Sequence, residues 1–149
     1  QTGQVSADAK FFVLFRAKKV EGGEWVDGYI VKKHGTYFLY DINNSDTCRQ
    51  NNYLIDEDTI CQYTGLTDMN GKKIFEGDIV RFGKNYGEVK FGLHESNWQI
   101  DKYNQGFFAK FPKVYFRNEL GFWRDKVIVT GNIYDNPELL EKGKENGTD

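Results

Sequence analysis

Short apolar and alternating runs in the first third of the chain predict β-strands. Residues 11–16 form an apolar, aromatic-rich run that is too short to favour a helix. A glycine-containing turn leads to a second strand at 25–31, and a third follows at 36–40, where β-branched and aromatic residues are dense. The pattern predicts an antiparallel β-unit over residues 11–60, preceded by a loose arm at 1–10.

The segment from residue 41 to residue 58 breaks this pattern because it is polar and acidic. Its charged residues are Asp41, Asp46, Asp56, Glu57 and Asp58 against Arg49 alone. A long polar segment between two strand-rich regions predicts a linker. We therefore expect this acidic stretch to separate the N-terminal β-unit from a second unit.

Turn signals organise the second unit, which we place at residues 61–136. Asn70-Gly71 predicts a tight turn because both residue types tolerate a positive φ. Two strands follow it on either side of Gly77, where we expect a bulge or a close backbone approach. The predicted strands of this unit are residues 73–75, 78–82, 88–91, 98–102, 107–111 and 126–130.

Only the end of the chain, residues 137–149, has the pattern of a helix followed by a tail. Asn136 is a suitable N-cap, and Pro137 suits the first helical position. Leu139 and Leu140 supply a short apolar edge. The whole pattern predicts a mainly β protein with an N-terminal antiparallel β-unit, a second β-unit and a short C-terminal helix.

Composition is that of a folded domain and narrows the choice of partners. The chain has 149 residues, and its 12 Phe, 9 Tyr and 3 Trp supply enough apolar surface for a core. The formal net charge of −2 gives no overall attraction to nucleic acid or to an anionic membrane. No apolar run approaches the roughly 18–20 residues that span a bilayer, so we expect no membrane partner.

Cysteine and histidine content argues against a disulfide-stabilised or metal-bound fold. Cys48 and Cys61 are the two cysteines and form no CxxC pattern, which suits a reducing cytosol, so we expect no disulfide-linked partner. Together with His34 and His94 they offer too few ligands for a metal ion. Neither a Gly-rich phosphate loop nor a Gly-x-Ser-x-Gly motif is present, so we expect no cofactor and no enzymatic activity.

Four segments occur in a characteristic order and together span about residues 11–140. They are Phe15–Lys18 with Gly23–Val26 and Gly28-Tyr29, then Gln62–Asp68, Asn70–Val80 and Gly131–Leu140. Through these segments the chain resembles the YopX family, small proteins of phages and prophages. Ala17 and Cys61 stand where many relatives have glycine, which argues against thiol chemistry at Cys61.

The resemblance implies a β-rich protein whose C-terminal part is similar to a partly open SH3-type barrel. It also implies a bacterial cytoplasm and a mobile-element origin, and it supplies no catalytic residue. The family-motif residues that it carries over are Gln62, Tyr63, Thr64, Gly65, Asn70, Gly71, Glu76, Gly77, Asp78, Asn132, Tyr134, Asn136 and Pro137. We expect these residues to be architectural.

One acidic motif is similar to the start of a calcium loop. It consists of Asp68, Asn70 and Gly71. Lys72 and Ile79 stand where an EF-hand needs an oxygen ligand and a glutamate, and the motif lies between strands. We therefore favour a hairpin turn.

A second acidic motif is the pair Glu76 and Asp78. On a regular strand the two carboxylates would share a face and could act as an acid and a base or hold a divalent ion. Gly77 breaks the regularity of the strand, however, and short carboxylates often bond turn amides. We favour a structural role, in which Asp78 fixes the turn that starts the strand.

Polar residues also mark the segment that matches the family best. Gln62, Tyr63 and Thr64 could read a ligand, or they could join the two β-units by hydrogen bonds. We favour the second interpretation.

Residues 107–126 interleave aromatic rings with cations. The five cations of this stretch stand against Glu119 and Asp125, a local balance of +3 in a slightly acidic chain. Nucleic-acid platforms use this mixture, because bases stack on rings while cations follow phosphates. The same pattern is typical of a half-buried strand with solvated lysines. The candidate interaction residues are Lys110, Lys113, Tyr115, Arg117, Trp123 and Arg124.

These observations favour a non-enzymatic binding or assembly module encoded by a phage or prophage. Small β-units offer edge strands and surface aromatics for association. The candidate partners are therefore a second copy of the chain or another phage or host protein. The alternative is a nucleic-acid-binding accessory protein that uses residues 107–126.

Overall fold

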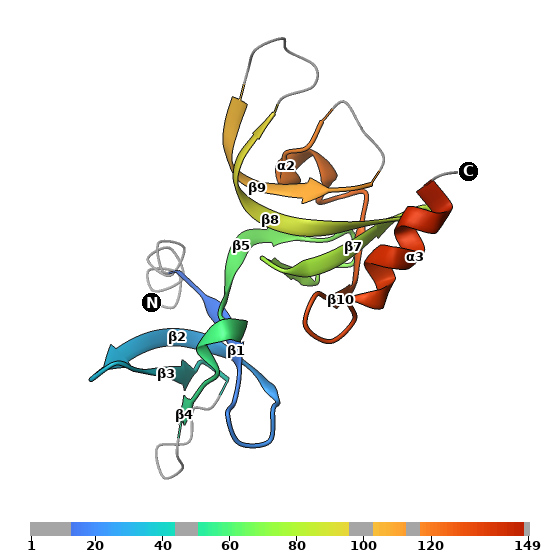
Figure 1. The fold of residues 1–149 in the computed structure, drawn as a ribbon. Coiled ribbons are helices and arrows are strands. Elements are labelled where there is room, and N and C mark those ends of the chain that lie inside the picture. The colour runs from blue at the N-terminus through green and yellow to red at the C-terminus, as the bar shows by residue number, and fades with distance from the viewer. Residues whose placement is uncertain (1–12, 44–50, 96–102, 113–116, 148–149) are drawn as a thin grey trace. The chain divides into compact units, whose positions relative to one another are not determined.

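A computed structural model describes residues 13–43, 51–95, 103–112 and 117–147. The fold is mainly β, as the sequence pattern predicted, with two antiparallel sheets and a few short helices (Figure 1). The chain divides into two compact units, residues 1–63 and 64–149. Within the described part of the chain, no helix is both long enough and apolar enough to cross a membrane.

The first unit is an antiparallel sheet. Its elements are β1 (Phe15–Lys18), β2 (Trp25–Lys33), β3 (Thr36–Asp41), β4 (Asn52–Leu54), the 3-10 helix η1 (Glu57–Thr59) and the start of β5 (Cys61–Thr67). The sheet has the strand order β4-β3-β2-β1-β5-β6, and its last strand, β6 (Lys73–Phe75), belongs to the second unit. Ala17, Leu39 and Ile55 form the buried core of the first unit, because apolar residues at these positions face one side of the sheet.

Gly28 lets β2 pass close to β3. It lies opposite Phe15 on one side and Asp41 on the other. A Cβ atom at this position would overlap the carbonyl oxygen of Tyr40. Any larger residue would push the strands apart, which explains a glycine in the interior of a strand.

Part of the linker expected at residues 41–58 belongs to this first unit, so the linker prediction was wrong for residues 52–58. β4 pairs with β3, and Ile55, which follows β4, is only 4% exposed. The carboxylate of Asp56 accepts a hydrogen bond from the N–H of Asp58 at 3.1 Å and so shapes the turn of η1. The acidic residues therefore build a turn that brings an apolar residue into the core.

The second unit holds a four-stranded sheet with two described helices. Its elements are the end of β5, then β6 (Lys73–Phe75), β7 (Asp78–Phe82), β8 (Asn85–Glu95), β9 (Tyr103–Lys110), α2 (Leu120–Trp123), β10 (Ile128–Asn132) and α3 (Glu138–Gly147). The sheet order is β10-β7-β8-β9. Its core is formed by Ile74, Val80, Val89, Ala109, Phe111, Leu120, Trp123 and Val127. Among the described residues both sheets are open, and no barrel closes.

Several predicted strands have the bounds expected from the sequence. The strands at 73–75 and 78–82 are confirmed, and Gly77 between them has a φ of 85°. The predicted strands at 88–91, 107–111 and 126–130 fall largely within β8, β9 and β10. The strand predicted at 98–102 lies outside the described residues.

Candidate interaction surface on the β8–β9 hairpin

The hairpin of β8 and β9 carries an apolar surface beyond the core. Its register places Phe91 opposite Phe107 and Leu93 opposite Gln105, while Tyr103 faces the end of β8. Because side chains alternate along a strand, these residues share one face. We call Phe91, Leu93, Tyr103 and Phe107 the apolar hairpin face.

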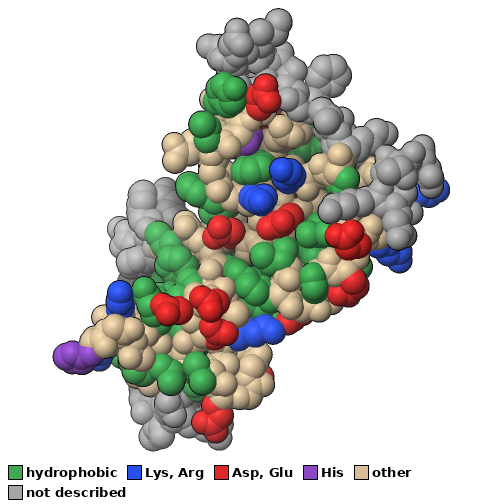
Figure 2. All heavy atoms as spheres, in the orientation of Figure 1, with side chains coloured by type: hydrophobic (Ala, Val, Ile, Leu, Met, Phe, Trp, Pro, Cys, Tyr) green, Lys and Arg blue, Asp and Glu red, His purple; other side chains and the backbone are tan. Residues whose placement is uncertain are grey.

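Exposure rises along this face as the hairpin leaves the core. The pair Val89 and Ala109 is fully buried, whereas Phe91 is 52% exposed, Leu93 69% and Tyr103 61%. Figure 2 shows hydrophobic side chains at the surface along this hairpin. Fully burying one such side chain would contribute about 1.5–3 kcal/mol, so this apolar group is a candidate interaction surface.

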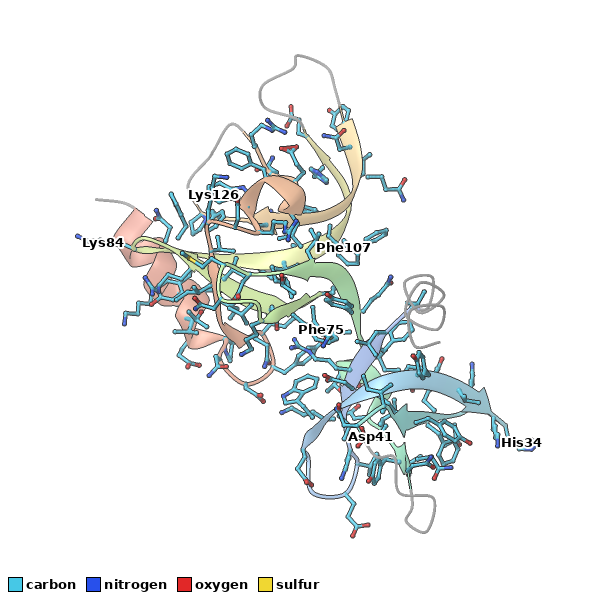
Figure 3. All side chains as sticks on the ribbon, turned by 180° about the vertical axis from the view of Figure 1, so that it is seen from behind. His34, Asp41, Phe75, Lys84, Phe107 and Lys126 are labelled. Atoms are coloured by element: carbon cyan, nitrogen blue, oxygen red, sulfur yellow. The ribbon has the colours of Figure 1, made fainter. Side chains whose placement is uncertain are left out.

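Aromatic packing orders the base of this face. The rings of Phe91 and Phe107 meet edge to face with centroids 4.8 Å apart, the geometry that aromatic pairs prefer. Phe107, which Figure 3 labels on β9, also packs against the core of the second unit. The exposed part of the face is therefore anchored to a rigid base.

Two glycines face each other in the middle of the hairpin. Gly92 and Gly106 are paired, with φ values of 151° and 150° that L-residues rarely adopt. In Figure 1 the two strands bend together along their length. A paired glycine step gives the backbone the freedom that such a bend needs.

Asn118 joins two places on the bent hairpin. Its carbonyl oxygen accepts a hydrogen bond from the N–H of Ala109 at 2.9 Å, and its side-chain amide donates to the carbonyl oxygen of Glu95 at 2.8 Å. Beside these hydrogen bonds, Glu119 and Phe108 form an isolated antiparallel β-bridge. Residues 117–119 therefore act as a strap that covers the outer edge of β9 near residues 108–109.

The aromatic and basic stretch at 107–126 does not form one surface. Trp123 is only 3% exposed and belongs to the core, and its indole N–H donates to the carbonyl oxygen of Arg117 at 2.7 Å. Its ring packs on Phe82, Phe111 and Phe122. Trp123 therefore has no ring face available for a base.

Cations gather instead around Phe122. The guanidinium of Arg117 lies 5.1 Å from the ring centroid and the ammonium of Lys126, which Figure 3 labels, lies 4.2 Å from it. Arg117 also pairs with Glu119, and Lys126 pairs with Asp125 at 3.2 Å. The hydrogen bond and charge of Lys126 lower the pKa of Asp125 from its ordinary value.

The remaining interaction candidates lie apart from this cluster or outside the structure. Lys110 and Arg124 are exposed, at the end of β9 and just after α2. Lys113 and Tyr115 lie outside the described residues. Because two of the four described cations are engaged by carboxylates, the cationic surface is smaller than the sequence indicates.

The pair Glu76 and Asp78 does not share a strand face. β6 ends at Phe75, and a turn at Glu76 and Gly77 separates it from Asp78 at the start of β7. Asp78 is 1% exposed, and its carboxylate accepts the N–H of Phe75 at 2.8 Å. This geometry is that of a carboxylate that closes a turn.

Asp68, Asn70 and Gly71 form a turn. One carboxylate oxygen of Asp68 accepts the N–H groups of Asn70 at 2.8 Å and Lys72 at 2.9 Å. The other oxygen accepts the N–H of Val129 at 2.8 Å, from a position 61 residues further along the chain. Three backbone donors thus occupy this buried carboxylate, which ties the turn to β10.

The C-terminal family-motif residues build a loop before α3. The side-chain oxygen of Asn132 accepts the N–H groups of Tyr134 and Asp135, both at 2.9 Å. The side-chain oxygen of Asn136 accepts the N–H of Asn132 at 3.2 Å and closes the loop, while its carbonyl oxygen accepts the N–H of Leu139 at 3.1 Å at the start of α3. Pro137 directly precedes α3.

Gly77 anchors two neighbouring segments. Its N–H donates to the carbonyl oxygen of Val89 at 2.8 Å, and its carbonyl oxygen accepts the N–H of Ile133 at 2.9 Å. Its φ of 85° is one that glycine adopts without steric penalty, so glycine suits this turn.

The segment Gln62–Gly65 lies within β5. Gln62 pairs with Phe15 of β1, and the N–H of Tyr63 donates to the carbonyl oxygen of Leu14 at 2.7 Å. The hydroxyl of Thr64 donates to the carbonyl oxygen of Ile74 at 2.7 Å. Gly65 has a φ of 86°. Each of these hydrogen bonds stays within one unit.

Sequence reasoning missed the apolar hairpin face itself. The predicted strand at 88–91 ended before Leu93, and Tyr103 fell between the predicted strands at 98–102 and 107–111. The available signal was the alternation of Val89, Phe91 and Leu93. Within the described residues, no cluster of three or more His, Cys, Asp or Glu side chains could hold a metal ion.

Comparison with known proteins places the chain in a family. It is similar to protein EF1440 from Enterococcus faecalis, whose crystal structure matches with a TM-score of 0.49 and 22% sequence identity over 87% of this chain and 98% of that chain. No curated protein matches it. The family described as YopX protein matches residues 14–141, in agreement with the resemblance of the four sequence segments. The chain belongs to the YopX family.

Proposed function

We propose that the chain is a non-enzymatic binding and assembly module that docks a protein partner through the apolar hairpin face. The observation that carries the proposal is the exposure of Phe91, Leu93 and Tyr103 on one face of an ordered hairpin. Exposed aromatic and aliphatic side chains beside a rigid base are typical of the centre of a protein interface.

The acidic residues support a module without catalysis. Asp68 and Asp78 are buried; the carboxylate of Asp68 accepts three backbone N–H groups, and Oδ2 of Asp78 accepts the N–H of Phe75. Groups engaged in this way serve the fold. The family resemblance adds a phage or prophage origin, a bacterial cytoplasm and a kinship of the second unit with SH3-type barrels, and we include these in the proposal.

Site-specific photo-crosslinking tests the proposal in a bacterial host. p-Benzoylphenylalanine in place of Leu93 is expected to give a discrete adduct with the protein partner on irradiation, because position 93 lies in the apolar hairpin face. The matched control places it at Lys90, which is exposed on the opposite face of β8. Absence of an adduct at position 93, or equal adducts at both positions, would contradict the proposal.

A second candidate function is nucleic-acid binding around Phe122. The observation that favours it is the pair of cations, Arg117 and Lys126, close to the Phe122 ring. Arg124 and Lys110 add exposed positive charge in the same unit. Single-stranded nucleic acids bind such mixtures of rings and cations, and they do so with a steep dependence on salt.

A further inference from the structure

β9 is an edge strand of the second sheet. The sheet order ends β8-β9, so one side of β9 pairs with β8 and the other faces outward. The N–H of Ala109 points outward, since it donates to Asn118 of the strap. Backbone groups alternate in direction along an antiparallel strand, so the N–H and C=O groups of Phe107, Gln105 and Tyr103 also point outward.

Residues 103–107 leave this edge open. Within the described part of the chain, no hydrogen bond reaches the outward groups of this segment, whereas the strap covers residues 108–109. Tyr103, Asn104 and Gln105 are exposed. We call residues 103–107 the open edge; it is bounded by the strap at one end and by the start of β9 at the other.

The open edge lacks the usual protection of an edge strand. Proteins blunt exposed edges with charged side chains, proline or bulges. The sequence Tyr-Asn-Gln-Gly-Phe has no charge and no proline, and its register with β8 is uninterrupted. Such an edge is suited to pairing with another strand.

The open edge is also complementary to itself. A two-fold axis through Gln105 would set Tyr103 of each copy opposite Phe107 of the other copy. Asn104 would lie opposite Gly106, so no like charges would meet. This register uses all five residues, and the strap stops the strands from sliding further. Aromatic pairs across antiparallel strands are favourable, and two-fold interfaces are the commonest in homo-oligomers.

We propose that the open edge pairs with the same edge of a second copy, forming an antiparallel two-fold dimer centred on Gln105. The proposal rests on the proposed function, because Tyr103 and Phe107 belong to the apolar hairpin face and the dimer would extend that face. Outward N–H and C=O groups of residues 103, 105 and 107 then bond across the axis.

Charge placed on the axis tests this dimer. Sedimentation velocity of the full chain is expected to show a dimer, and Gln105→Lys and Gln105→Glu are each expected to raise its Kd about tenfold or more, because like charges then face each other. An equimolar mixture of the two variants is expected to restore a dimer. The control Lys90→Glu changes charge on the same hairpin away from the edge and is expected to leave the dimer unchanged.

The outcomes distinguish the edge-paired dimer from the more general role as a binding module. A monomeric wild-type chain, or variants that dimerise like the wild type, would overturn the two-fold edge pairing. In that case a crosslinked adduct at position 93 that contains a different protein still supports the binding module. An adduct of twice the chain mass, together with a dimer restored in the mixture of the two Gln105 variants, supports both the edge-paired dimer and the binding module.

Discussion

The imidazole of His94 stacks on the ring of Phe108 with centroids 4.5 Å apart and planes 28° from parallel. The two residues are not cross-strand partners, since His94 pairs with Asn104 and Phe108 with Lys90. The stack forms across the glycine pair in the bend, where no side chain intervenes. His94 is buried, and within the described structure its Nε2 has no hydrogen-bond partner.

This stack predicts that His94 stabilises the hairpin mainly by packing of its ring. His94→Phe is expected to keep most of the free energy of unfolding, because it removes the unpaired Nε2 and gives up only the 3.3 Å contact between Nδ1 and the carbonyl oxygen of Gly92. His94→Ala is expected to lower it by about 2 kcal/mol through loss of packing. Thermal denaturation measures both. An equal loss in both variants would contradict the prediction and would indicate a role for the nitrogen.

Asp78 is predicted to stabilise the turn between β6 and β7. Asp78→Ala leaves the buried N–H of Phe75 without this acceptor, and we expect a loss of roughly 2 kcal/mol, or about 4–8 °C in Tm. Glu76→Ala is the matched control, because Glu76 is partly exposed, and its effect should stay within about 0.5 kcal/mol. An unchanged Tm for Asp78→Ala would refute the structural role.

Asp68 is predicted to hold β10 in place as well as its own turn. Asp68→Ala removes the acceptor of three N–H groups, so we expect a loss of roughly 3 kcal/mol. Asp68→Asn keeps one acceptor oxygen and should lose less. Amide hydrogen exchange gives the sharper readout, since the N–H of Val129 should exchange faster in Asp68→Ala. Unchanged protection of Val129 would show that the long-range bond contributes nothing.

Oligonucleotide titration separates the two candidate functions. The leading proposal expects no saturable change of intrinsic fluorescence with short single strands between about 50 and 200 mM salt. Saturable binding that weakens steeply with salt would put the nucleic-acid function first. That binding should then be lost in Lys110→Glu with Arg124→Glu and kept in Lys84→Glu, an exposed control on the β7–β8 turn that Figure 3 labels.

The sequence was most informative where turn chemistry and alternation agree. Asn70-Gly71 predicted its turn, and Gly71 has a φ of 83°. The break at Gly77 was predicted because a glycine inside an apolar run often marks a bulge or a turn in a strand. The role of Asp68 in holding Val129 could not be found from local pattern, since the two residues are far apart in sequence.

Local composition misled the interpretation in two places. Ile55 lies among carboxylates, and average polarity concealed its burial in the first core. Trp123 lies among cations, and the interleaved pattern concealed that α2 turns its ring into the second core. In both cases tertiary packing decides which face of a segment is buried, and polarity averaged over a segment does not report this.

β5 belongs to both compact units, because Gln62 pairs with β1 while the Thr64 hydroxyl bonds to Ile74. The boundary between the two units therefore falls inside a strand. A fragment that ends at residue 60 deprives β1 of β5, one of its two neighbours, and one that starts at residue 64 takes only the end of the strand. For expression of fragments, split-protein complementation or engineered fusion, residues 61–63 belong with the first piece and residues 64–67 with the second.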